Sequence, residues 1–190
     1  MQSYPNAAKG LNRIFLSQIL VIVGVVLALT FNVVTAMVAV VLAVVSAVLY
    51  LMGLYRARMD DQGYGMALTL VIVSLVLGLV QGIFREGSLM YTALEVACSA
   101  LDLITLYLVC RTTSQLAGGR GREDIARQGH RVWVVNLACV VTAVLINVVL
   151  SRPVMHRDTL RLLLLVALVL TVVGTVLYVK FLYQASKALD

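Results

Sequence analysis

Six apolar segments, each about as long as the hydrocarbon core of a bilayer is thick, constrain the fold of this 190-residue chain most strongly. Hydrophobic residues make up 62% of the chain and the mean hydropathy is +1.00, whereas a soluble domain is about half apolar. We therefore expect an all-α integral membrane protein with six transmembrane helices. The predicted spans are 14–31, 33–55, 66–84, 91–110, 132–150 and 160–183.

The lysine and arginine residues are distributed unevenly between the two sides of these spans. The side that holds both termini carries Lys9, Arg13, Arg56, Arg58, Arg111, Arg120, Arg122, Arg127, Arg131, Lys180 and Lys187. The opposite side carries only Arg85, Arg152, Arg157 and Arg161. Because positive residues are retained in the cytoplasm, we expect both termini to be cytoplasmic, in the cell membrane of a prokaryote. The net charge of +6 follows from this topology and does not indicate a nucleic-acid partner.

A short internal match predicts that the spans form three tandem αα-hairpins. Residues 48–57 and 176–185, at the ends of the second and sixth spans, are identical at six of ten positions without a gap. A weaker match, 106–108, ends the fourth span. We therefore predict parallel repeats within one membrane domain, 1–190, although leucine, valine and tyrosine also recur by chance in apolar helices. The predicted hairpins comprise residues 9–58, 62–114 and 129–187.

Two acidic residues, Glu95 and Asp102, lie inside the fourth span. They are seven positions apart, close to two helical turns, so both side chains project from one face of the helix, with Cys98 between them. An ionised carboxylate at the centre of a bilayer costs about 2.5–3.5 kcal/mol on insertion scales. Acidic residues inside a span usually mark a functional site, so we place a candidate site here.

Depth along the spans adds polar residues to this candidate site. Counting about 1.5 Å per residue places Gln81 and Asn147 near the level of Glu95, toward the outer face. Asp102 falls near the midplane, in a layer with Ser74 and other hydroxyl residues. We expect it to lack a partner and to accept a proton or a cation. The predicted binding residues are Glu95, Asp102, Cys98, Gln81 and Asn147. The alternative is that these side chains only join helices through hydrogen bonds, at about 0.6–2 kcal/mol each.

Two polar stretches between the spans are predicted to be connections. Residues 111–131 are rich in arginine and glycine, and we expect a flexible basic cytoplasmic loop that offers a contact for anionic lipid or a cytoplasmic partner protein. Residues 60–65 begin with two aspartates. We predict a turn there, because one acidic pair is a poor metal cage.

The sequence contains none of the motifs that would indicate a familiar enzyme. Zinc-protease, nucleophile-elbow and phosphate-loop patterns are absent. The three cysteines lack the spacing of a metal site or a disulfide framework. We therefore expect neither a metal nor a cofactor. The two carboxyls leave an intramembrane enzyme as a third, less favoured interpretation.

Two functional interpretations remain open. The first is a small-solute or ion binding and transport component with an outward-facing polar site around Glu95 and Asp102. In length and number of spans the chain resembles the substrate-binding subunits of energy-coupling factor transporters. Their A-x-x-x-A pattern on the first helix is missing, since residues 23–28 read Val-Gly-Val-Val-Leu-Ala, so no residue role is carried over. The second is a noncatalytic membrane scaffold or regulatory subunit of a larger complex, with alanines 39, 43 and 47 as a packing seam. Both interpretations allow oligomerisation.

Overall fold

The computed structural model describes the backbone of residues 4–30, 32–85, 88–150 and 157–190, and their side chains except at 143–150, 157–165, 167 and 168. Within these ranges the chain forms helices and short connections, without a strand. The helices in the described ranges are α1 (Pro5–Ala28), α2 (Val33–Ala57), α3 (Gln62–Gln81), α4 (Leu89–Gly119), α5 (Glu123–Leu150) and α6 (Arg157–Leu189). Each predicted span overlaps one helix, so the prediction of an all-α fold with six helices is confirmed.

The helices carry the surface of a membrane-embedded protein. Five of them contain a described stretch that is long and apolar enough to cross a bilayer. The side chains of α5 are described only as far as Thr142, and this part begins with the mixed charged stretch 123–131. Large apolar side chains are widely exposed, with Val33 and Leu79 at 76% and Leu89 at 84%. A soluble monomer rarely exposes so extended an apolar surface, whereas lipid accommodates it.

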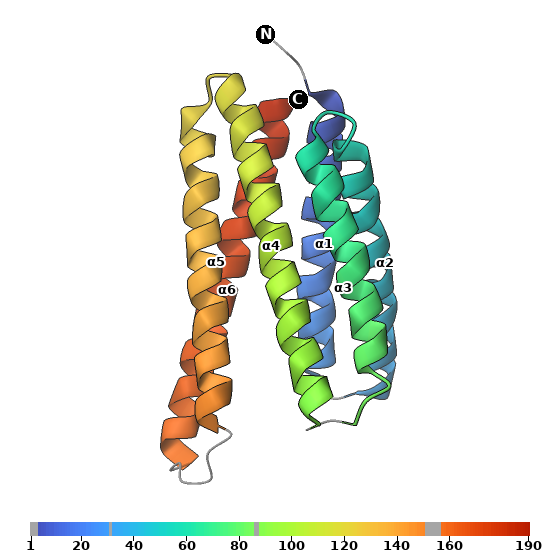
Figure 1. Ribbon diagram of the computed structural model, residues 1–190, viewed down its shortest axis with the longest axis vertical. Helices are drawn as coiled ribbons and strands as arrows, with labels where there is room; N and C mark the ends of the chain where they lie inside the picture. The colour runs from blue at the N-terminus through green and yellow to red at the C-terminus, as the bar shows by residue number, and fades with distance from the viewer. Residues whose placement is uncertain (1–3, 31, 86–87, 151–156) are drawn as a thin grey trace.

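The six described helices form a ring. Each helix packs against its neighbours in sequence, and α1 closes the ring against α6. Consecutive helices run in opposite directions, and both ends of the chain lie at one end of the bundle (Figure 1). We call this the terminal end, and the opposite one the far end. Because α6 packs against α1 as extensively as against α5, these contacts do not divide the ring into three hairpins, and the hairpin repeat stays a prediction.

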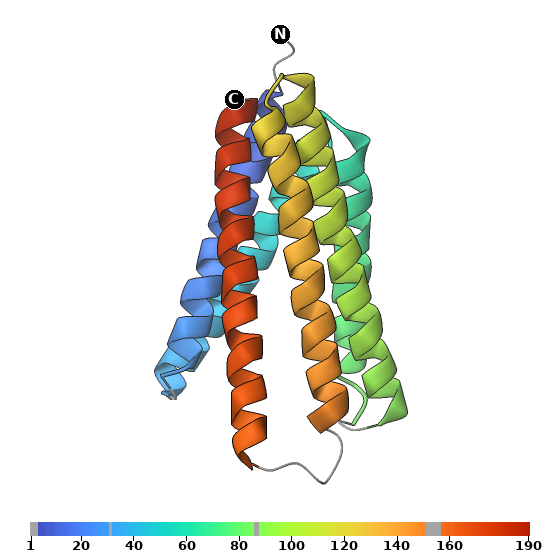
Figure 2. The same ribbon diagram turned by 90° about the vertical axis from the view of Figure 1, so that its left-hand side faces the viewer.

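Buried side chains gather in the half of the bundle next to the terminal end. Toward the far end, α1 and α2 diverge from α6 (Figure 2). The buried apolar residues are Ala7, Ala8, Leu11, Ile14, Leu54, Ala57, Tyr64, Ala67, Val109, Cys110, Leu116, Ala117, Ile125, Val132, Tyr178, Phe181, Leu182, Ala185 and Leu189. The tight packing that holds the ring together is therefore concentrated at the terminal end.

The closest approach between α1 and α2 is made by two glycines. A Cβ atom on Gly10 would lie 2.6 Å from the Gly53 carbonyl oxygen, and one on Gly53 would lie 2.8 Å from the Gly10 carbonyl oxygen. Small residues allow two helix backbones to approach in this way in a membrane. In the predicted alanine seam of α2, Ala39 lies against α1, whereas Ala43 and Ala47 line the central cavity described below.

Two adjacent aspartates in the turn between α2 and α3 fix the starts of two helices. The Asp60 carboxylate accepts hydrogen bonds from the Asn6 side chain at 3.0 Å and from the Ala7 backbone N–H at 2.7 Å, at the start of α1. Asp61 caps α3 by accepting a hydrogen bond from the Gly63 N–H at 2.6 Å. Carboxylates stabilise helix starts because N–H groups are free there and the helix dipole is positive. Of the predicted turn 60–65, only Asp60 and Asp61 lie between the helices, because α3 already begins at Gln62.

The predicted flexible loop at 111–131 is largely helical. α4 continues to Gly119 and α5 begins at Glu123, so the connection is only the turn 120–122. The helix continues because apolar and hydroxyl residues recur at helical spacing and pack into the core. These buried residues are Val109, Cys110, Thr112, Thr113, Leu116 and Ala117. The basic side chains of this segment are therefore carried mainly by two helix ends.

The turn between α4 and α5 is closed by a Schellman motif. Gly121 has a positive φ of 76°, a conformation that favours glycine. The Gly121 N–H donates to the Gly118 carbonyl at 2.9 Å, and the Arg122 N–H donates to the Ala117 carbonyl at 3.0 Å. The Arg122 guanidinium also donates hydrogen bonds to Asp124 and lowers the pKa of that exposed carboxyl. A four-residue glycine-rich sequence thus specifies a tight reversal instead of a flexible loop.

Candidate binding cavity

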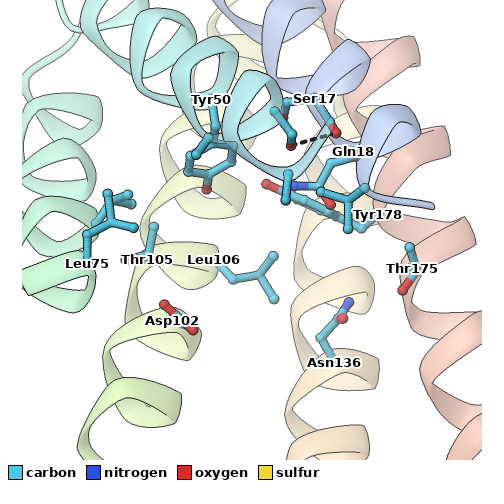
Figure 3. A pocket seen from close by; sticks show the side chains of 15 residues that line it. Ser17, Gln18, Tyr50, Leu75, Asp102, Thr105, Leu106, Asn136, Thr175 and Tyr178 are labelled. Carbon is cyan, nitrogen blue, oxygen red and sulfur yellow. Dashed lines mark hydrogen bonds between the residues drawn. The ribbon is translucent and has the colours of Figure 1, made fainter. Parts of the chain in front are cut away.

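A cavity of about 430 Å³ lies inside the helix ring, at the point where the buried core stops. All six described helices contribute to its wall, and Figure 3 shows several of the polar side chains around it. These polar lining residues are Ser17, Gln18, Ser46, Tyr50, Asp102, Thr105, Asn136, Thr175 and Tyr178. We call this space the central cavity. Because the packed core closes it on the terminal side, it opens toward the far half of the bundle.

Buried hydroxyl groups face the central cavity on its terminal side. Tyr178 reaches from α6 toward Tyr50 on α2 (Figure 3). Tyr178 is 5% exposed. Its hydroxyl lies near that of Tyr50, but the two are not aligned for a hydrogen bond, and it has no other partner in the described part of the chain. Thr105 is 3% exposed, and its hydroxyl likewise has no partner among the described residues. Buried polar groups are normally hydrogen-bonded, so both hydroxyls retain unused hydrogen-bonding capacity at the cavity wall.

Asp102 lies where the central cavity meets a second cavity, a groove of about 580 Å³ between α3 and α4. We call this second space the α3–α4 groove. The Ser74 hydroxyl donates a hydrogen bond to Asp102 Oδ1 at 2.9 Å. The expectation that Asp102 lacks a partner is therefore wrong. Its partner Ser74 belongs to the hydroxyl layer expected at the same depth, and the bond occupies one of the two carboxylate oxygens.

The structure brings three of the five predicted binding residues together. Asp102, Gln81 and Cys98 line the α3–α4 groove, and only Asp102 also lines the central cavity. Glu95 is exposed on α4 and lines neither space. The side chain of Asn147 lies outside the described residues. The predicted roles of Glu95 and Asn147 therefore still rest on the sequence.

Several side-chain O–H and N–H groups around the central cavity already donate hydrogen bonds to backbone carbonyls. The Ser46 hydroxyl donates to the Ser17 carbonyl at 2.9 Å, and the Thr175 hydroxyl donates within α6 at 2.8 Å. The Asn136 amide donates to one carbonyl of α5 at 2.9 Å and to one of α6 at 3.4 Å. Oxygen lone pairs remain on all these side chains. The wall therefore offers more acceptors than donors.

The described wall of the central cavity contains one carboxyl group. Among the described residues, Asp102 is the only acidic one that lines it, and no described lysine, arginine or histidine does so. In the part of the chain that the structure describes, no three His, Cys, Asp or Glu side chains are grouped as metal ligands would be. The described wall thus combines one carboxylate with hydroxyl and amide groups and with apolar side chains. Such a wall favours a small, partly apolar molecule over a bare metal ion.

Several lining residues were missed by reasoning from the sequence, among them Gln18, Asn136, Thr175 and Tyr178. Each is a polar interruption of an apolar segment, and this signal was visible. Depth counting gives the height of a residue in the membrane but not the rotation of its helix. The inward direction of these side chains depends on the ring order of the helices, which the sequence does not provide.

In the described chain, the fold and cavity define a membrane protein of six helices with an internal cavity that is lined by apolar side chains and by several polar ones. No model of a protein family, no curated protein and no solved structure matches the chain. Its function is therefore argued from its own residues.

Proposed function

We propose that the protein binds a small solute or ion in the central cavity and serves as a binding or transport component of a cell membrane. The observation that carries this proposal is the meeting of the Asp102 carboxylate with the buried, unpartnered hydroxyls of Tyr178 and Thr105 in one cavity, as far as the chain is described. A buried hydroxyl without a hydrogen bond costs about 1–3 kcal/mol. An occupant of the cavity that bonds to these groups offsets this cost.

The proposal includes an orientation, with both termini in the cytoplasm and the far end outside. It is supported by the excess of lysine and arginine toward the terminal end, where Arg56, Arg111 and Lys187 lie on three different helices. Because the packed core closes the central cavity on the terminal side, this orientation makes the cavity face outward.

The exposure of Glu95 favours a second candidate function. Glu95 lies two turns from Asp102 on the same face of α4, and the described residues leave its side chain exposed. A carboxylate that faces hydrocarbon costs about 2.5–3.5 kcal/mol, so this face meets either water or another protein. Water would form part of an aqueous route to Asp102. Another protein would make the chain a scaffold or regulatory subunit.

Binding is tested by filling the central cavity. Ala43 is exposed and lines it, so Ala43→Trp places an indole inside without disturbing the packed core. The purified protein is unfolded thermally in detergent with small amines, alcohols, carboxylates and alkali-metal ions. At least one class is expected to stabilise the wild type, by about 2.7 kcal/mol at a hundredfold excess over Kd, but not Ala43→Trp. The matched control Ala28→Trp, at the exposed far end of α1, should respond like the wild type.

The surroundings of Glu95 are tested by thiol labelling. In a variant with Cys98, Cys110 and Cys139 replaced by alanine, Glu95→Cys is expected to react with a membrane-impermeant methanethiosulfonate reagent added outside. Val96→Cys is the matched control, because Val96 is 56% exposed at the same depth on a different face of α4. It should stay unmodified, since thiols in lipid ionise poorly. Protection of Glu95→Cys together with cross-linking to a second chain would instead favour the scaffold.

A further inference from the structure

We propose that the ligand of the central cavity is a protonated primary amine with a small apolar body, whose ammonium group binds Asp102. This inference rests on the proposed function and names the chemical class of the solute. It follows from three properties of the described wall: its charge, its balance of hydrogen-bond donors and acceptors, and its apolar surface.

The charge of the wall selects a cation. In the part of the chain that the structure describes, Asp102 is the only acidic or basic residue that lines the central cavity. Asp102 is exposed to the open space of the cavity, and a carboxylate there attracts a monovalent cation and repels an anion. Ser74 donates to Asp102 Oδ1 from the side of the α3–α4 groove, which orients the carboxylate and leaves Oδ2 free to accept from a ligand.

The hydrogen-bonding groups of the cavity wall favour a ligand that donates hydrogen bonds. An ammonium group carries three N–H donors and no acceptor. The wall presents the complementary set, because Ser46, Thr175 and Asn136 already donate to backbone carbonyls and keep only lone pairs. The free hydroxyls of Tyr178 and Thr105 accept as well, within the described chain. An ammonium group that reaches three of these acceptors would need no water to satisfy its N–H groups.

The remaining wall favours a ligand whose uncharged part is apolar and small. Apolar side chains from α1, α2, α3 and α4 complete the lining, namely Val21, Ala43, Ala47, Val71, Leu75 and Leu106. The volume of about 430 Å³ suits a small organic molecule and is far larger than a dehydrated metal ion. The rings of Tyr50 and Tyr178 also provide faces that attract an organic cation. A short alkylammonium or arylalkylammonium ion meets all three requirements.

The test compares straight-chain primary amines from ethylamine to hexylamine with alcohols and carboxylates of the same lengths. Binding to the full-length protein in detergent is measured by titration calorimetry near neutral pH. The wild type is expected to bind at least one amine about 10- to 100-fold more tightly than its matched alcohol, the range expected for hydrogen bonds to a charged group. Asp102→Asn should remove this preference, whereas Glu123→Gln, which removes an exposed carboxylate outside the cavity, should keep it.

The comparison of the three ligand series in the wild type needs no variant, so it decides the question even if Asp102→Asn does not fold. If an alcohol or a carboxylate binds as tightly as the amine, and Ala43→Trp abolishes that binding, the amine proposal is overturned while the proposed binding function survives. If no ligand of any series binds, the amine proposal is overturned, and the proposed binding function then depends on the response to alkali-metal ions in the thermal test. If the amine preference persists in folded Asp102→Asn, the role of Asp102 is overturned.

Discussion

Replacing Gly10 with alanine is expected to lower the free energy of unfolding by about 2 kcal/mol or more, as measured by denaturant titration in mixed micelles followed by circular dichroism. The added methyl group would meet the Gly53 carbonyl oxygen at 2.6 Å and the Ala57 Cβ at 2.8 Å. Neither obstacle is the flexible tip of a side chain, so α1 and α2 must move apart. The gain in helix propensity from alanine is only about 0.5–1 kcal/mol, so the steric effect decides the sign.

Gly78→Ala is the matched control for this prediction. Gly78 lies inside α3, and a Cβ atom there would meet no other group within 4 Å in the described structure. Only helix propensity then acts, and the variant should be more stable by about 0.5–1 kcal/mol. If Gly10→Ala and Gly78→Ala were equally stabilising, the close crossing of α1 and α2 would be contradicted.

Replacing Tyr178 with phenylalanine is expected to change stability and binding in opposite directions. The Tyr178 hydroxyl is buried without a hydrogen bond in the described chain, so its removal should raise the free energy of unfolding of the ligand-free protein by about 1 kcal/mol. The same variant should bind the preferred amine about threefold to tenfold more weakly, because one acceptor is lost. Unfolding is followed by circular dichroism and binding by calorimetry.

Tyr64→Phe provides the contrast. The Tyr64 hydroxyl and Thr113 Oγ1 lie 2.7 Å apart in the core, and both residues are fully buried. Removing this hydroxyl leaves Thr113 without its partner and should destabilise the protein by about 1–3 kcal/mol. Amine affinity should be unchanged, since Tyr64 does not line the central cavity. A loss of stability in Tyr178→Phe as large as that in Tyr64→Phe would show that the Tyr178 hydroxyl has an internal partner.

Hydropathy alone was sufficient to predict the six helices, because the bilayer demands apolar segments of a fixed length. It failed where the chain leaves the hydrocarbon region. The segment 111–131 was predicted to be a loop from its arginines and glycines, yet its helical part is specified by buried residues such as Thr113 and Leu116. Those residues recur at helical spacing, and this periodicity predicts a helix that continues beyond the apolar span.

The sequence predicts the depth of the candidate site in the membrane, but it does not predict which residues line the cavity. Asp102 and Ser74 were placed in one layer by counting residues, and the structure joins them by a hydrogen bond. Glu95 shares a helix face with Asp102, yet it lies beyond the central cavity, because that cavity begins only where the helices meet the packed core. Seven-residue spacing fixes a direction around one helix axis. It does not show how far along that axis the neighbouring helices stay in contact.

The concentration of packing at the terminal end gives the bundle a mechanical property. Helices that are clamped at one end act as levers, and α4 alone has 31 residues. Beyond the buried Thr105, α4 extends about 24 Å to Leu89, so a rotation of about 5° at the packed end displaces that end of the helix by about 2 Å. Transmembrane helices adjust to bilayer thickness by tilting. A tilt of single helices about this packed end would therefore change the width of the path into the central cavity.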